Sequence, residues 1–113
     1  FQHLNKEAYE TGYDHETASP YGLVLVLRNA DERLRDAVVA SLQNHGVEFR
    51  RGVAGGGNQL RQPYLRRRYG TAYAEFPNAE HVHWNGYAIG LWPSLEPVEI
   101  KWLCEKLNGL KAC

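Results

Sequence analysis

The sequence contains no methionine among its 113 residues. We therefore expect that it does not start at a translation start and that it is a piece of a longer protein. It also has no apolar run of about 18 residues, the length needed to cross a bilayer, and no basic-then-apolar pattern typical of secretion. These absences argue against a membrane-spanning protein.

Cysteine is scarce, and net charge is zero. Cys104 and Cys113 do not form a C-x-x-C pair, which favours a reduced, cytoplasmic setting. Thirteen basic and thirteen acidic residues cancel, so the overall charge attracts neither nucleic acid nor a membrane. The charges are nevertheless unevenly placed, because the segment Phe49–Ala74 holds six arginines and no acidic residue.

The length predicts one domain with its own core. Residues 1–20 are polar and weakly periodic, and we interpret them as an irregular lead-in with a short helix over Lys6–Tyr9. Residues 21–113 are predicted to form a single α/β domain. The continuous apolar run Gly22–Leu27 predicts a central strand buried on both faces, or nearly so.

Two helices and two further strands are expected after that run. Asn29, with Glu32 in capping-box position, predicts the first helix, and Gly46 is expected to end it. Ser94 is expected to cap the last helix, which Asn108-Gly109 ends. The stripes expected to be buried are Leu34, Ala37, Val38, Ser41 and Leu42 on the first helix and Ile100, Leu103, Cys104 and Leu107 on the last.

The strands predicted besides the first one cover Val47–Arg51 and Tyr87–Trp92. The resulting order is strand, helix, strand, long loop, strand, helix. It predicts a two-layer α/β (α+β) fold, in which a small sheet of about three strands carries helices on one face.

The most unusual segment is A-G-G-G-N-Q-L-R-Q-P-Y, residues 54–64. Its glycines allow tight backbone turns, and Pro63 is expected to stop any helix or central strand there. The hydrogen-bonding side chains that follow the glycines are typical of a loop that recognises a phosphate or carboxylate; they are Asn58, Gln59, Arg61 and Gln62. A flexible hairpin with a solvated basic face is the alternative.

Known phosphate-binding patterns do not fit this loop. No Lys-Ser/Thr pair follows Gly57, and Leu60 stands where a dinucleotide-binding pattern needs glycine. Leu65–Tyr73 could be helical or irregular, and its Arg66–Arg68 triplet is expected to face solvent or a partner chain. R-R-R-Y-G resembles the start of an RNA-recognition strand, but the aromatic residues that should follow it are missing.

Phe76–Trp84 is expected to hold a turn at Pro77-Asn78 and then a possible short helix. His81 and His83 within it are nevertheless interpreted as lying on one face of a strand. A metal site needs three or four ligands, so we expect no metal here and interpret both residues as polar or partner-facing contacts. No nucleophile motif occurs, and no catalytic residue is assigned.

Taken together, the motifs resemble the C-terminal small domain of the DegT/DnrJ/EryC1/StrS family. The most specific match is Gly57–Tyr64, G-N-Q-L-R-Q-P-Y, which is similar to the G-N-x-x-R-Q-P-aromatic signature of the CDP-4-keto-6-deoxyglucose-3-dehydrase branch. Supporting matches are Tyr21-Gly22-Leu23, Gly46–Arg50 and Asn85–Leu95. The sequence departs from the branch by having three glycines before Asn58.

The resemblance implies the small-domain fold of fold-type I pyridoxal-phosphate enzymes. It implies part of a pyridoxal- or pyridoxamine-phosphate-dependent 3-dehydratase or aminotransferase acting on nucleotide-linked 4-keto-6-deoxyhexoses, for lipopolysaccharide or other deoxysugar biosynthesis. Gly57, Asn58, Arg61 and Gln62 would face the substrate or cofactor. The partners it implies are a large cofactor-binding domain, a homodimer mate and the nucleotide-linked sugar.

The resemblance also implies that this chain alone holds no cofactor and is inactive. The family's cofactor-anchoring domain is absent from these residues, and none of Lys6, Lys101, Lys106 and Lys111 stands in a Schiff-base motif. Two alternatives stay open: a stand-alone ligand-binding module without a catalytic domain, and a nucleic-acid-binding domain that uses the basic segment Arg50–Arg68.

Overall fold

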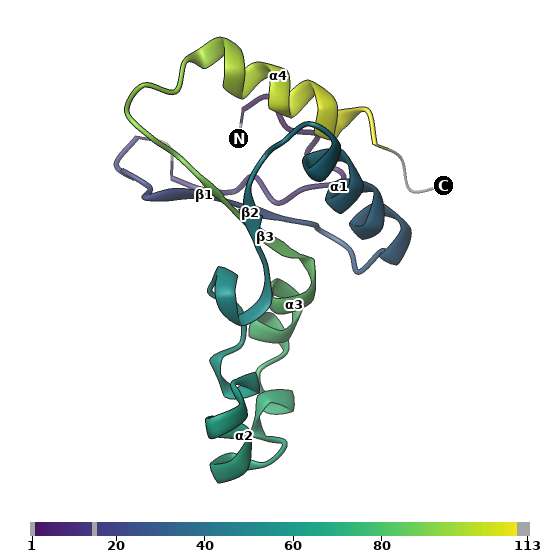
Figure 1. Ribbon diagram of the computed structural model, residues 1–113, viewed down its shortest axis with the longest axis vertical. Helices are drawn as coiled ribbons and strands as arrows, with labels where there is room; N and C mark the ends of the chain where they lie inside the picture. Colours follow the sequence, from purple (N-terminus) through teal and green to yellow (C-terminus); the bar gives the residue numbers. More distant parts are fainter. Residues whose placement is uncertain (1, 15, 111–113) are drawn as a thin grey trace.

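The computed structural model describes residues 2–14 and 16–110. Figure 1 shows a sheet with helices α1 and α4 on one side, and an arm, residues 52–85, that projects from the sheet along the longest dimension of 46 Å. The elements are β1 (Gly22–Val26), α1 (Glu32–Asn44), β2 (Phe49–Arg50), η1 (Gly52–Gly55), η2 (Gln59–Arg61), α2 (Pro63–Tyr69), η3 (Ala72–Glu75), α3 (Pro77–Asn85), β3 (Gly86–Gly90) and α4 (Pro97–Asn108).

The sheet has the antiparallel order β1-β3-β2. The prediction that the first strand is central was therefore wrong, because β3, the last strand in the chain, pairs between the other two. Leu25 pairs with Tyr87 in this register, and both are completely buried. The preceding residue, Val24, points to the opposite face and is 37% exposed, whereas Val26 on that same face is 5% exposed, so the outer face of β1 is only partly buried.

Both long helices cover the face of the sheet that carries Leu25 and Tyr87, which confirms the two-layer fold. From α1, Leu34, Val38 and Leu42 enter the core at the spacing of one helical face. The α4 helix contributes Cys104 and Leu107, while Ile100 and Leu103 pack at its border. Burial of this face is the main stabilising contribution to the domain.

The helix ends differ from the predicted caps. Asp31, not Asn29, caps α1, because its carboxylate accepts the backbone N–H groups of Arg33 and Leu34. In α4 the cap is Glu96 rather than Ser94, in a capping box with Glu99. The predicted stop at Gly46 is confirmed, and its φ of 69° strongly favours glycine.

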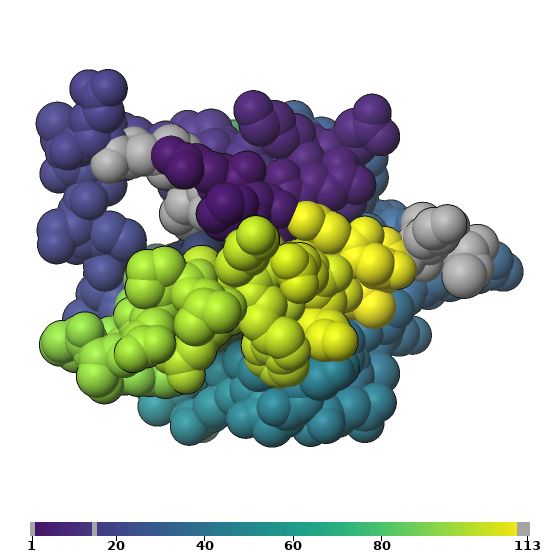
Figure 2. Space-filling model, turned by 90° about the horizontal axis from the view of Figure 1, so that it is seen from above, coloured from purple at the N-terminus to yellow at the C-terminus, as the bar shows by residue number. Residues whose placement is uncertain are grey.

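The N-terminal lead-in is attached to the domain core. Leu4 and Tyr9 are buried, and the Tyr9 hydroxyl donates to the Leu107 carbonyl oxygen at 2.8 Å. Tyr9 also forms a bridge with Leu27, and Lys6–Tyr9 is a hydrogen-bonded turn rather than the expected helix. Figure 2 shows the N-terminal residues, in purple, lying against α4.

The arm replaces what the sequence predicted as a long loop. Short helices and single turns follow one another, and Pro63 and Pro77 each begin a helix, where a missing N–H costs nothing. The expectation that Pro63 excludes a helix was therefore wrong, because Pro63 is the first residue of α2. Among the described residues, no helix has both the length and the apolar character to cross a bilayer.

Candidate functional site

The segment 57–62 is held against α3 by the side chain of Asn58. This residue is 4% exposed, and its amide nitrogen donates to the Tyr73 carbonyl oxygen at 3.0 Å and to Glu80 Oε1 at 2.8 Å. Its side-chain oxygen accepts the backbone N–H of Leu60 at 3.2 Å, which caps η2. All the contacts of this amide therefore fix the fold of the arm.

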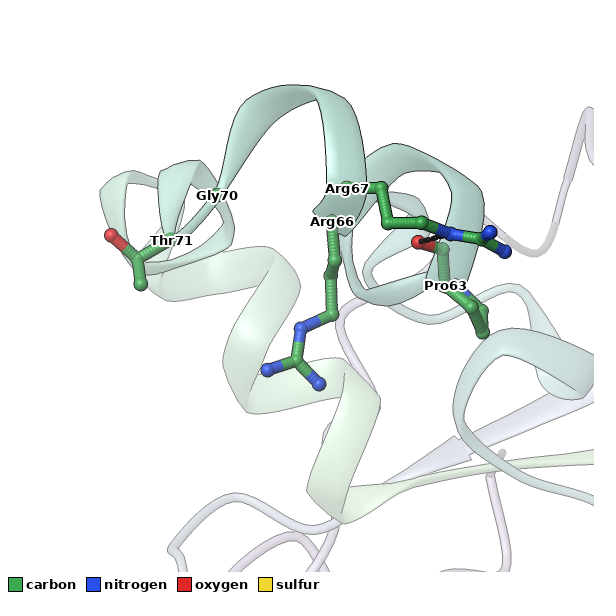
Figure 3. A pocket seen from close by; sticks show the side chains of 5 residues that line it. All are labelled: Pro63, Arg66, Arg67, Gly70 and Thr71. Carbon is green, nitrogen blue, oxygen red and sulfur yellow. Dashed lines mark hydrogen bonds between the residues drawn. The ribbon is translucent and has the colours of Figure 1, made fainter.

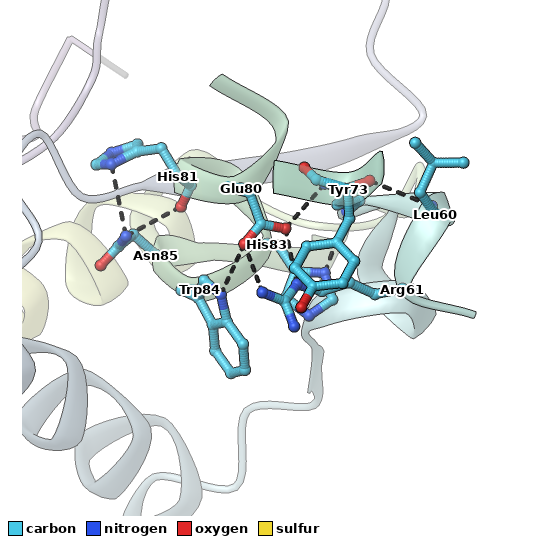
Figure 4. Close-up of polar contacts among 9 residues, drawn as sticks. Leu60, Arg61, Tyr73, Glu80, His81, His83, Trp84 and Asn85 are labelled. Carbon is cyan, nitrogen blue, oxygen red and sulfur yellow. Dashed lines mark hydrogen bonds and ion pairs between the residues drawn. The ribbon is translucent and has the colours of Figure 1, made fainter. Parts of the chain in front are cut away.

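Arg61 and Glu80 form a two-point ion pair (Figure 4). Arg61 Nε donates to Oε1 and Nη2 donates to Oε2, each at 2.7 Å. The ring centroids of Tyr73 and Trp84 lie 4.0 and 5.0 Å from the guanidinium carbon, so the cation contacts two aromatic rings. Such parallel hydrogen bonds with added ring contacts fix the orientation of an arginine.

Glu80 is the centre of this network. Its carboxylate accepts from Arg61, from Asn58 and, at 3.4 Å, from the indole N–H of Trp84. The hydrogen bonds from Arg61 are the largest cause that lowers the Glu80 pKa from 4.5 to about 2, and they outweigh the opposing effect of burial. Glu80 is thus a carboxylate anion across the physiological pH range, and this pairing argues against a general-acid role.

The three consecutive glycines allow a close approach of backbone to backbone. A Cβ on Gly57 would stand 2.8 Å from the Gly52 carbonyl oxygen and 2.8 Å from His83 Nδ1, and a Cβ on Gly55 would stand 2.7 Å from the Arg50 carbonyl oxygen. Gly56 has a φ of 80°. The glycines therefore serve the packing of the arm itself.

The two histidines lie on the helix α3, so the prediction that they share one face of a strand was wrong. Two positions apart on a helix, they point in different directions. His81 Nε2 donates to the Leu27 carbonyl oxygen at 2.7 Å, and His83 Nδ1 accepts the backbone N–H of Asn58 at 3.1 Å. Burial lowers the pKa of His83 and favours this neutral, accepting form.

Both histidines therefore make polar contacts, as predicted. Within residues 2–14 and 16–110, no group of three or more histidine, cysteine, aspartate or glutamate side chains is arranged to hold a metal ion.

Of the four predicted site residues, the structure brings Asn58 and Arg61 together on Glu80, while Gly57 packs against the Gly52 carbonyl and His83 Nδ1. Gln62 lies at the start of α2, where its backbone carbonyl accepts from the next turn and no described residue hydrogen-bonds its side chain. Their contact with substrate stays a prediction. Sequence reasoning missed Glu80 and Trp84 as their partners, although the spacing of four residues would place both on one helical face.

The described residues line two notable hollows. A small one of about 470 Å³ lies at the end of the arm and is lined by Pro63, Arg66, Arg67, Gly70 and Thr71 (Figure 3). A second, of about 1010 Å³, lies between the sheet and the first turns of α4 and is mostly apolar. Exposed aromatic residues stand at its border, with Tyr21 fully exposed and Trp92 54% exposed.

Comparison with known proteins identifies the family. The family model described as the DegT/DnrJ/EryC1/StrS aminotransferase family matches residues 1–108, and the chain therefore belongs to this family of pyridoxal-phosphate-dependent sugar aminotransferases and dehydratases. No curated protein and no solved structure gives a significant match.

The residues described here do not fit a complete pyridoxal phosphate site. Covalent attachment of the cofactor requires a lysine amine beside a phosphate-binding cradle. Lys6, Lys101 and Lys106 are exposed on the lead-in and on α4, away from the arginines of the arm, and Lys111 lies outside the described residues. The described lysines therefore do not form a site for covalent attachment of the cofactor.

Proposed function

We propose that the chain is the C-terminal small domain of a pyridoxal- or pyridoxamine-phosphate-dependent enzyme of nucleotide-deoxysugar biosynthesis. The favoured reaction is 3-dehydration of a nucleotide-linked 4-keto-6-deoxyhexose, and sugar amination is the alternative. The observation that carries the proposal is the family match over residues 1–108, together with the G-N-Q-L-R-Q-P-Y segment within the projecting arm.

In this proposal the segment 57–62 faces the bound sugar nucleotide or the cofactor edge. The network around Glu80 supports the idea because it holds the segment in one conformation before any ligand arrives, which reduces the entropy lost on binding. Arg61 keeps one guanidinium nitrogen, Nη1, that is not bonded to Glu80. The Gln62 side chain, half-buried and without a hydrogen bond from the described residues, is the second group that could reach a ligand.

The cofactor would be held by another domain or by a homodimer mate of the complete enzyme. The apolar hollow between the sheet and α4 supports a protein partner, because exposed aromatic surface of this kind is typical of interfaces. We propose that the cofactor-holding domain covers it and that the enzyme works in the cytoplasm.

A spectroscopic titration tests whether this chain depends on another domain for its cofactor. Pyridoxal phosphate is added to the purified chain, dialysed, and the absorbance of a lysine aldimine is recorded. We expect no stoichiometric adduct, because Lys6, Lys101 and Lys106 lie on exposed surface without a phosphate cradle. A saturable one-to-one adduct would contradict the proposal.

The reaction and the role of the segment are tested in the complete enzyme that carries this chain. With a nucleotide-linked 4-keto-6-deoxyhexose as substrate, a 3-deoxy product supports dehydration, and an amino sugar supports amination. Gln62→Ala should lower kcat/KM about tenfold while leaving the melting temperature unchanged, since its side chain makes no internal hydrogen bond. Gln43, exposed on α1 and outside the segment 57–62, provides the matched control, Gln43→Ala, which should leave both unchanged.

A further inference from the structure

The end of the arm carries positive charge that the protein does not neutralise. Arg28, Arg35 and Arg61 all have a carboxylate partner, whereas none of the described carboxylates pairs with an arginine of the triplet 66–68. All three triplet side chains are exposed. The chain as a whole has no net charge, so this unpaired positive charge is a local feature.

The triplet borders a hollow with only cationic, hydroxyl and apolar lining. Figure 3 shows the side chains of Arg66 and Arg67 extending in different directions from adjacent positions of α2. Arg67 lies next to Pro63, and its Nε donates to the Pro63 carbonyl oxygen at 3.4 Å. Gly70 has a φ of 59°, which lets the chain reverse directly after α2 and brings Thr71 to the same hollow. No carboxylate lines it.

Two structural roles account for part of this arrangement. Arg66–Arg68 occupy the last turn of α2, where cations interact favourably with the carbonyl end of a helix. The Arg66 and Arg68 guanidinium groups also stack on Tyr73 and Tyr69, at 5.6 and 5.4 Å from the ring centroids. Neither role uses the outward N–H donors, because ring contacts and helix carbonyls leave the fork of a guanidinium accessible to an oxyanion.

We propose that this hollow is a binding site for a phosphate-class oxyanion, with Arg66 and Arg67 as its main donors. The natural ligand would be the diphosphate of a nucleotide-linked sugar, and this part of the inference rests on the proposed function. Because Arg61 is paired with Glu80, the unpaired arginines at the end of the arm are better candidates for binding the negative charge of the ligand. Arg61 instead positions the segment that leads to these arginines.

The test is a calorimetric titration of the full chain with inorganic pyrophosphate at low ionic strength. We expect saturable binding of one anion, weakened about tenfold or more in Arg66→Gln/Arg67→Gln, because each substitution removes a charge-assisted hydrogen bond. Lys101→Gln/Lys106→Gln removes the same net charge from exposed positions of α4 and should leave the affinity within about twofold.

Absence of saturable binding, or equal weakening by both double variants, would overturn the proposal. Cytidine diphosphate should compete with pyrophosphate at the same site. If single-stranded RNA binds far more tightly than pyrophosphate, and if the salt dependence of its affinity indicates contacts to several phosphates, the surface is a nucleic-acid-binding surface and the proposal fails. The titration needs no catalytic activity, so its failure is distinguishable from failure of the product assay described above.

Discussion

Arg61 and Glu80, 19 residues apart in the sequence, are joined by two parallel hydrogen bonds of 2.7 Å each. This pair links η2 to α3 and ties the glycine-rich segment to the strand-connected part of the arm. About a fifth of each side chain is exposed, so the pair is partly shielded from water. The arm therefore has an internal polar core of its own, separate from the apolar core between the sheet and the long helices.

We predict that Arg61→Ala destabilises the protein. The substitution leaves the Glu80 carboxylate without its cationic partner, and loss of a partly shielded, charge-assisted pair costs about 1–2 kcal/mol in free energy of unfolding. Urea unfolding measures this loss. Arg67→Ala, at an exposed position of α2, is the matched control and should change stability by less than about 0.5 kcal/mol.

Equal and small effects of Arg61→Ala and Arg67→Ala would show that the ion pair does not hold the arm. A reduced kcat/KM in the complete enzyme without loss of stability would instead assign Arg61 to the ligand alone.

A second prediction concerns acid. The Glu80 pKa in the folded protein is about 2, below its ordinary value of 4.5, so the unfolded chain binds the proton more readily. The stability that this group contributes is complete above about pH 4.5 and is lost as the pH falls towards about 2.

The measurement compares urea unfolding of the wild type and Glu80→Gln at about pH 6 and about pH 3. The difference in stability between the two proteins should shrink on acidification, because Glu80 of the wild type takes up a proton on unfolding at about pH 3, whereas the glutamine variant lacks the ionisable group. A difference that stays constant between these two pH values would contradict the assigned pKa.

The sequence predicted the apolar layer better than the arm. Periodic leucines and valines identify α1, and a buried cysteine–leucine stripe identifies α4, because burial of one helical face leaves a pattern in local sequence. The place of β1 at the sheet edge could not be predicted in this way. Strand order depends on pairing between segments that are distant in the sequence. Here β1 ends at Val26 and its partner β3 begins 60 residues later, at Gly86.

The arm was predicted less well because its stabilising contacts are polar and long-range. Asn58 and Arg61 were noticed for the chemistry they could offer to a ligand, but the same donors are satisfied by Glu80. Composition cannot distinguish these outcomes, since a guanidinium suits an internal carboxylate as well as a bound phosphate. His81 and His83 were misassigned to a strand because a spacing of two residues is typical of one face of a strand. Two histidines at this spacing also occur in a helix, where they point in different directions.

A third prediction tests the close backbone packing of the glycine-rich segment. Gly57→Ala places a methyl group 2.8 Å from both the Gly52 carbonyl oxygen and His83 Nδ1, so the arm has to shift. We expect a loss of about 1–3 kcal/mol, in the range of overpacking substitutions. Thermal unfolding with circular dichroism gives the measurement.

The matched control for this change is Gly90→Ala. Gly90 is exposed at the end of β3, and a Cβ there meets nothing within 4 Å. The control should therefore be close to neutral. If both alanine variants have the same melting temperature as the wild type, the glycines serve flexibility and not packing.

The last prediction concerns the edge strand. Leu25 lies on β1, which pairs with only one strand of the sheet, β3, yet its side chain is 0% exposed because α1, α4 and the lead-in cover the inner face of the sheet. Leu25→Ala should lower the free energy of unfolding by about 2–5 kcal/mol, the cost of lost burial plus the cavity that remains. Val24→Ala, the adjacent position on the opposite face and 37% exposed, should cost well under half as much. Urea unfolding of both variants under the same conditions decides the point. A similar loss for the two residues would mean that the outer face of the sheet is as well packed as the inner one, and that the helices do not define a single buried layer.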